Sequence, residues 1–392
     1  MDFNPNEQYN NVQNGNGANG QNTGFNGYNQ NPQGNSYRNS VPPYVPHTPP
    51  YIPPVPPQYQ QYQPIYQYPV NSEFEKKQKD KKILKSMATA FGLAVIIYVV
   101  ISNAFVFGLY LLSRYSSVIY GFLNNSTGQY ILQSFLSVFF IGGPFLISYL
   151  ILRKKKYVGI LPYGTAYNKK AAISLTMFLI PIMLISTIAV NLISYIFQSV
   201  VGITFESGMD DMTVDGPIGA LALIISLAVI PAFVEEFCIR GVVLQPLRRY
   251  GDKFAIIVSA LIFSVLHGNM VQIPYTLVAG IYLGYLCVAT GSIWPSIILH
   301  FVNNMYSAVQ LIILAEFGET ASTVAAYVML GAFVVIGIVG GIIFFRMNYK
   351  ADLKKGVNTL KTGEKIGAVL SSPALIIAIV FMLITTAASI VI

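Results

Sequence analysis

The chain has 392 residues, of which 54% are hydrophobic and only 10% charged, and its mean hydropathy is +0.54. A typical soluble domain carries about 25% charged residues, so the composition excludes an ordinary soluble protein and indicates a polytopic membrane protein. The net charge of +8 does not predict a nucleic-acid partner, because the basic residues lie in short runs beside apolar segments, where they set membrane topology. The two cysteines, Cys238 and Cys287, lie within apolar segments and predict neither a disulfide framework nor a cysteine-based zinc site.

Residues 1–75 differ in composition from the rest of the chain. Asn, Gly and Gln dominate up to Ser36, and Pro, Tyr and Gln dominate from Val41 to Val70. So few aliphatic side chains cannot form a core, and the first residues lack the apolar stretch of a signal peptide. We predict a disordered cytoplasmic tail with unknown partners, and favour a solvated extension over a tyrosine-based recognition element.

The rest of the chain contains nine apolar segments, each close to the roughly 20 residues that cross a bilayer. Their approximate limits are 87–112, 130–152, 171–199, 218–247, 253–269, 271–289, 292–314, 321–346 and 365–391. The predicted fold class is therefore all-α, a transmembrane helical bundle of about eight or nine spans. Beyond the tail we expect N-terminal helices (76–217), a helical core that carries the polar motifs (218–314) and C-terminal helices (315–392).

Charged residues fall into loops of alternating character. The runs at 76–85, 153–170, 248–253 and 346–365 are basic, whereas 206–215 and 316–319 are acidic. Because basic loops stay on the cytoplasmic side, the pattern predicts a multi-pass protein of the cell membrane with a cytoplasmic N-terminus. With nine spans the C-terminus lies outside.

Three polar clusters interrupt the apolar segments: Glu235-Glu236-x-x-x-Arg240, Phe263-x-x-x-His267 and His300-x-x-x-Asn304. An ionisable side chain near the bilayer centre costs about 2.5–3.5 kcal/mol on insertion scales, and such residues usually have a function. The functional site is therefore expected where these clusters meet.

The adjacent glutamates are predicted to have different roles, since neighbouring side chains on a helix point about 100° apart. Arg240 follows Glu236 by four residues, the spacing at which a buried ion pair forms on one helix face. Glu235 is then left without a local partner and is a candidate general base. Pro231 is expected to bend the same helix. The alternative is that both glutamates belong to one ion-pair cluster that only holds helices together.

His267 and His300 are the histidines of the membrane region. A single histidine on an apolar segment is usually a hydrogen-bonded core residue, but two on separate segments favour a site. Asn304 shares a helix face with His300, and their imidazole and carboxamide can donate to an oxyanion. Phe263 is expected to pack on His267 as an ordinary packing residue, and Asn303 is expected to lie outside the site.

The three motifs, in this order on membrane helices, resemble those of the CPBP intramembrane protease family, also called the type II CAAX prenyl endopeptidase or abortive-infection family. The resemblance covers about residues 218–310. It implies that Glu235 activates water with help from His267, while His300 and Asn304 stabilise the oxyanion. It also implies that Glu236 and Arg240 hold the glutamate helix in place.

Members of this family are often described as metalloproteases. Glu235, His267 and His300 are accordingly candidate ligands for zinc or another divalent metal. The chain lacks the His-Glu-x-x-His motif of zinc proteases, so we favour water activated by a glutamate over an obligatory metal, with no cofactor assigned.

The leading hypothesis is an intramembrane endopeptidase that cleaves a membrane-associated or lipidated substrate. The alternatives are a transporter with a proton relay, which the absence of an evident internal repeat disfavours, and a catalytically silent membrane scaffold.

The predicted orientation places His267 deep in the membrane, toward the outer side. This depth conflicts with the site open to the cytosol that the family resemblance implies. Either the fifth helix starts further inside than Lys253 suggests, or its polar end folds back.

Overall fold

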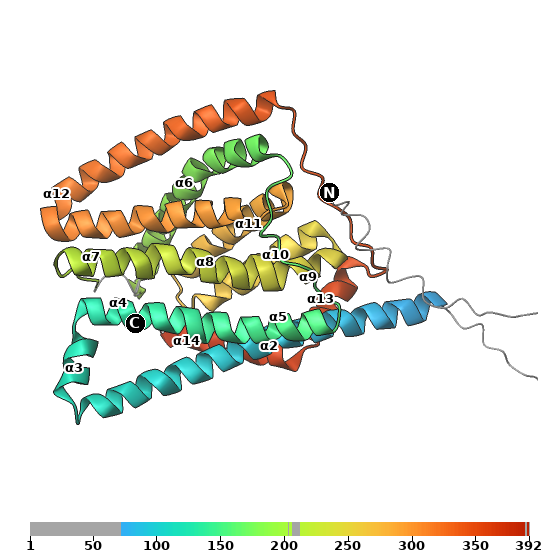
Figure 1. Cartoon of the computed structure of the whole chain (residues 1–392), viewed down its shortest axis with the longest axis horizontal. Helices are drawn as coiled ribbons and strands as arrows, with labels where there is room; N and C mark the ends of the chain where they lie inside the picture. The colour runs from blue at the N-terminus through green and yellow to red at the C-terminus, as the bar shows by residue number, and fades with distance from the viewer. Residues whose placement is uncertain (1–71, 203, 206–211, 389, 392) are drawn as a thin grey trace, which may run out of the picture. The chain divides into compact units, whose positions relative to one another are not determined.

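The structure is a computed structural model that describes residues 72–202, 204–205, 212–388 and 390–391 (Figure 1). The predicted disordered tail lies outside the described residues except for its last four, which are helical because α2 begins at Ser72. Part of the predicted acidic loop, residues 206–211, also lies outside them.

The predicted all-α class is confirmed. The helices are α2 (Ser72–Ser113), α3 (Ser117–Asn124), α4 (Ser126–Leu136), η1 (Ser137–Ile141), α5 (Gly142–Lys154), α6 (Lys169–Val201), α7 (Gly216–Ile224), η2 (Ile225–Val229), α8 (Ile230–Glu236), η3 (Phe237–Leu244), α9 (Gln245–Leu247), η4 (Arg248–Tyr250), α10 (Asp252–Leu266), α11 (Gln272–Thr290), α12 (Trp294–Arg346), α13 (Thr362–Leu370) and α14 (Pro373–Ala388). The segments η1, η2 and η3 are π-helical and η4 is a 3-10 turn. Two short strands, β1 (Thr204–Phe205) and β2 (Ile390–Val391), pair antiparallel.

The structure does not confirm the predicted number of eight or nine membrane spans. Within the described residues, six helices are long and apolar enough to cross a membrane, or seven if α13 and α14, which are bent by 76°, form one span. Two features account for the difference: α10 has only 15 residues, and the 53-residue α12 contains two predicted segments. The chain is a multi-pass membrane protein, and its span number is not confirmed.

The long helix α12 consists of two limbs that meet at Gly318. This residue has φ 80° and ψ 178°, a backbone conformation that side chains disfavour and glycine tolerates. The limbs fold back on each other (Figure 1), and Gln310 of the first hydrogen-bonds to Ser322 of the second at 3.0 Å. The turn therefore ends the first limb, which carries the His300 motif, and begins a separate helix that packs on α6.

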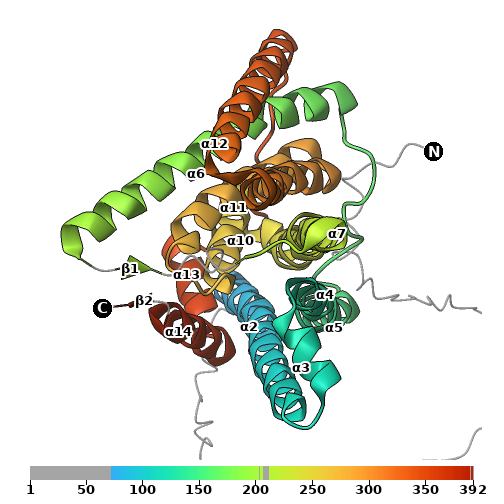
Figure 2. The ribbon, with the colours of Figure 1, turned by 90° about the vertical axis from the view of Figure 1, so that its left-hand side faces the viewer.

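Helices from distant parts of the sequence surround the motif-bearing segments. The α10–α11 hairpin packs on η3 and α6, α2 packs on α5 and α14, and the line of α4, η1 and α5 lies beside that of α7, η2 and α8 (Figures 1 and 2). The α10–α11 contact is close, because a Cβ on Gly280 would lie 3.0 Å from Cα of Ala260. This packing brings all three motifs into one region of the bundle.

The start of α10 is held by contacts with neighbouring segments. Asp252 is only 1% exposed, since it pairs with Arg248 at 2.7 Å and accepts from the backbone N–H of Lys354 at 2.9 Å. The segment after α12 thus covers the start of the helix at Asp252. With 15 residues, α10 extends for about 22 Å, so His267 at its end stays within the bundle.

Candidate active site

The two glutamates lie on α8, a helix of seven residues between the π-helical segments η2 and η3. Such segments occur frequently at functional sites, because the wider turn shifts side chains out of the α-helical register. Pro231 near the start of α8 has no N–H to donate to the carbonyl four residues earlier, that of Leu227. This carbonyl accepts a hydrogen bond from Asn304 Nδ2 at 3.0 Å. The irregular helix thereby fixes one residue of another motif.

Glu236 forms the predicted pair with Arg240 and also binds a histidine. Glu236 Oε1 lies 3.0 Å from Arg240 Nη1 and 3.0 Å from His300 Nδ1, and the Glu236 and Arg240 side chains are fully buried. Arg240 Nη2 donates to the carbonyl of Gly280 at 3.4 Å. Glu236 therefore joins its own helix to the His300 helix, a link that sequence spacing did not predict.

Phe263 does more than an ordinary packing residue. Its ring centroid lies 4.6 Å from the guanidinium carbon of Arg240, a cation–π contact, and 4.8 Å from the ring of His267, edge to face. The ring of His300 lies 6.0 Å away. Phe263 thus packs against the buried arginine and both imidazoles, and the interpretation as simple packing was incomplete.

Glu235 has a different environment from its neighbour. Its side chain is 23% exposed, and Oε2 lies 3.8 Å from His300 Nε2, too long for a hydrogen bond. Among the described residues, this buried oxygen has no hydrogen-bond partner; the same holds for Glu236 Oε2, but the Glu236 side chain is fully buried. The predicted carboxylate without a local partner is therefore present, next to an imidazole on another helix.

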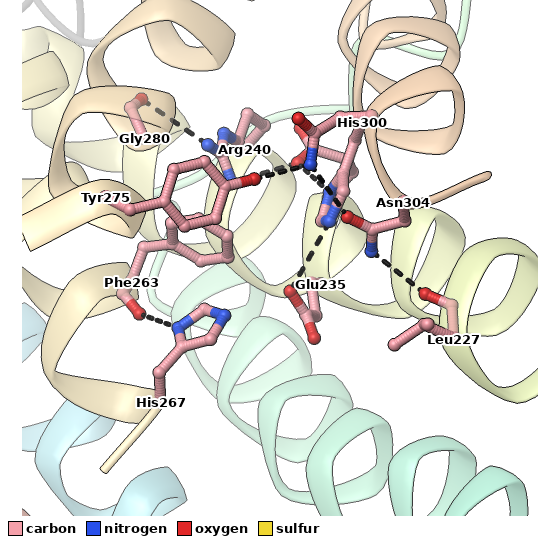
Figure 3. Close-up of polar contacts among 11 residues, drawn as sticks. Leu227, Glu235, Arg240, Phe263, His267, Tyr275, Gly280, His300 and Asn304 are labelled. Atoms are coloured by element: carbon pink, nitrogen blue, oxygen red, sulfur yellow. Dashed lines mark hydrogen bonds and ion pairs between the residues drawn. The ribbon is translucent and has the colours of Figure 1, made fainter. Parts of the chain in front are cut away.

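His267 caps the end of α10 and faces the same space as Glu235. Its Nδ1 lies 2.8 Å from the carbonyl of Phe263, so Nδ1 carries the proton that is donated and Nε2 is free for another partner. Figure 3 shows the imidazole and the Glu235 carboxylate on the same side of the site. Both line a cavity of about 410 Å³.

Asn303 and Tyr275 complete the polar contacts, and neither was predicted to do so. Asn303 Nδ2 donates to Asn304 Oδ1 at 3.1 Å and to the hydroxyl of Tyr275 (Figure 3). Asn303 was expected outside the site on the basis of its helix face; the structure shows that its side chain nevertheless contacts that of Asn304. No sequence pattern predicts the contact of Tyr275. Pro231, in contrast, predicts that the Leu227 carbonyl lacks its donor within the helix and can accept from another helix.

The candidate metal ligands do not form a metal site. Within the described part of the chain, no group of three or more His, Cys, Asp or Glu side chains is placed to hold a metal ion. Glu235, His267 and His300 as arranged do not fit a bound zinc, and we derive no step through one.

The fold and the site define a multi-pass helical membrane protein with a carboxylate, two imidazoles and a carboxamide gathered within one bundle. Residues 217–306 match the model of a family described as Type II CAAX prenyl endopeptidase Rce1-like. The match spans α7 to the first limb of α12, about a quarter of the chain, and confirms the family resemblance predicted from the three motifs. No curated protein and no solved structure matches the chain.

Proposed function

We propose that the protein is an intramembrane endopeptidase that hydrolyses a peptide bond in a prenylated, membrane-associated protein. The observation that carries the proposal is the unpartnered Oε2 of Glu235, which lies 3.8 Å from His300 Nε2, on a side chain that shares a cavity with His267. A buried carboxylate oxygen without a partner is costly and is suited to hold and deprotonate a water molecule.

The chemistry follows from the positions of the donors and acceptors. Glu235 accepts a proton from water, and His267 Nε2 orients the same water as a hydrogen-bond acceptor. The hydroxide oxygen forms a bond to the substrate carbonyl carbon, and the carbonyl oxygen becomes an oxyanion. His300, when protonated at both nitrogens, donates from Nδ1 to Glu236 and from Nε2 to the oxyanion. The oxyanion then re-forms the C=O bond as the C–N bond breaks, the proton on Glu235 passes to the leaving amine, and the other product is a carboxylic acid.

Asn304 is proposed as the second oxyanion donor. One N–H of its Nδ2 is used on the carbonyl of Leu227, and the other is available to substrate. The contact from Asn303 to Asn304 Oδ1 holds the amide with its NH₂ group toward the carbonyl of Leu227. The supporting roles of Glu236, Arg240 and Phe263 are to hold His300 and the glutamate helix, through the contacts described above.

We keep the predicted orientation as part of the proposal, with the N-terminus cytoplasmic and the C-terminus outside. Basic residues from distant segments meet at one end of the bundle: Arg249 pairs with Asp80 at 3.3 Å, and Lys81 pairs with Glu364 at 3.1 Å. This clustering supports placing that end in the cytoplasm. Residues 218–314 are the proposed catalytic core.

The decisive test is a Glu235→Gln variant of the full chain, reconstituted in liposomes with a farnesylated fluorogenic peptide. We expect cleavage to be abolished while thermal stability and insertion match the parent, because Gln keeps the size of the side chain and removes the base. Parental cleavage by this variant would refute the hydrolytic mechanism. The transporter and scaffold alternatives both predict that the parent itself cleaves nothing.

A further inference from the structure

The cavity at Glu235 and His267 has a second wall that lies outside the matched residues 217–306. This wall comes from α2 and from the α4–η1 segment, and its residues recur about once per helical turn. The residues are Tyr98, Ser102, Asn103 and Val106 on α2, and Gln133, Leu136, Ser137 and Ile141 on α4–η1. In Figure 3 the Glu235 carboxylate points toward the pale green ribbon of this second segment. Each helix therefore turns one stripe toward the site.

Both stripes carry a carboxamide and a hydroxyl with unused hydrogen-bonding capacity. Asn103 Nδ2 donates to the carbonyl of Val99 at 2.8 Å, which leaves Oδ1 as a free acceptor. The side chains of Gln133 and Ser137 make no hydrogen bond to any described residue. Carboxamides are expensive to place on a spanning helix, and here two of them face one cavity from different helices.

We infer that this wall binds the backbone of the peptide substrate, with Asn103 and Gln133 as positioning residues; the inference rests on the proposed function. A peptide that leaves water to bind in this cavity must find partners for its N–H and C=O groups. Soluble proteases and peptide-binding domains can offer the edge of a sheet. The walls of this cavity come from helices, whose backbone groups bond mainly within each helix. Side-chain amides, which reproduce both groups of a peptide unit, take over that role.

The chemistry of the wall favours a peptide over a hydrocarbon chain. An isoprenoid in contact with Asn103 and Gln133 would leave their polar atoms desolvated without partners, at about 1–3 kcal/mol for each group. An extended peptide supplies an N–H for Asn103 Oδ1 and a C=O and N–H for the Gln133 amide. The isoprenoid is then expected to contact other, apolar parts of the bundle.

The test uses Asn103→Leu and Gln133→Leu with two matched controls. Asn124 makes the same contact as Asn103, from Nδ2 to the carbonyl four residues earlier at 2.8 Å, but does not line the cavity. Gln129 lies one turn before Gln133 on α4 and donates to the carbonyl of Leu123 instead. The control variants are therefore Asn124→Leu and Gln129→Leu.

In liposomes with the farnesylated peptide, each cavity variant should raise KM about three- to tenfold, the loss of roughly one hydrogen bond. We expect kcat to stay within about twofold, because backbone binding is shared by ground state and transition state. The controls should match the parent. If a leucine variant lowers Tm, Asn103→Ala and Gln133→Met remove the same carboxamides.

A second measurement separates substrate contact from a structural effect. KM is measured on parent and variants with peptides that are N-methylated at one backbone position at a time. The methylation that removes the N–H bound by Asn103 should raise KM for the parent but should not raise KM for Asn103→Leu. An unchanged KM in both cavity variants, or a methylation penalty that persists in Asn103→Leu, overturns the inference. Such an outcome would leave the proposed function intact as long as Glu235→Gln is inactive in the same assay. An active Glu235→Gln would refute the proposed function itself.

Discussion

Asn304 Nδ2 donates to the carbonyl oxygen of Leu227 at 3.0 Å, and this bond joins the first limb of α12 to the irregular helix that carries Glu235. The acceptor is available because Pro231, four residues on, has no N–H to offer it. A helix defect in one motif segment thus orients the amide of another motif. The contact links the geometry of the backbone to the proposed oxyanion site.

Pro231→Ala should therefore lower activity while it stabilises the helix. The new N–H competes with Asn304 for the Leu227 carbonyl, and removal of a helical proline relieves a penalty of up to about 3 kcal/mol. We expect kcat to fall about tenfold or less and Tm to stay the same or rise. Pro181→Ala, within α6 and away from the site, is the control for helix straightening. A Pro231→Ala enzyme with parental kcat would show that the bond has no catalytic role.

The buried pair of Glu236 and Arg240 allows folding and catalysis to be separated. Arg240→Met leaves a buried carboxylate without its cation and should cost about 3–5 kcal/mol in the free energy of unfolding. The double variant Glu236→Leu with Arg240→Met removes both charges and should recover much of that loss. It should still cleave poorly, because His300 Nδ1 loses its acceptor at 3.0 Å. Thermal unfolding in detergent and the peptide assay measure the two effects; a stable and fully active double variant would contradict the positioning role.

Asn304→Ala should lower kcat by about 10²–10³, the usual effect of removing one oxyanion donor. Tyr275→Phe should have a smaller effect, since it removes only a partner of Asn303, which in turn orients Asn304. Single-turnover rates on the farnesylated peptide distinguish the two. A loss of activity in Tyr275→Phe as large as that in Asn304→Ala would assign the tyrosine hydroxyl a direct role in the reaction.

Chelation should leave cleavage unchanged. Within the described residues, Glu235, His267 and His300 are not placed as a ligand set, and the proposed steps use water activated by Glu235 and oriented by His267, without a metal. Parent enzyme is assayed after prolonged dialysis against a strong chelator and again after added Zn²⁺. Activity that disappears on chelation and returns with zinc would require a rearranged site that brings the three side chains together.

Two local features of the candidate site were predictable from residue types and spacing. The pair of Glu236 and Arg240 follows from their i, i+4 spacing, and the lack of a local partner for Glu235 follows from the 100° between neighbours on a helix. The nine apolar segments all correspond to helical parts of the structure, although their number as membrane spans was not confirmed. The missed features involve residues far apart in the chain, such as the link from Glu236 to His300 and the contact of Asn303 with Tyr275.

By itself, the sequence determined that this is a helical membrane protein with costly polar groups in apolar segments, because hydropathy and local spacing act within one helix. Only the tertiary structure decided which helices face one another. It placed Asn103 and Gln133 opposite Glu235 and turned the α12 chain back at Gly318. The start of α10 likewise lies beneath the segment that follows α12. These arrangements depend on contacts between helices, and such contacts leave no periodic signal in a single chain.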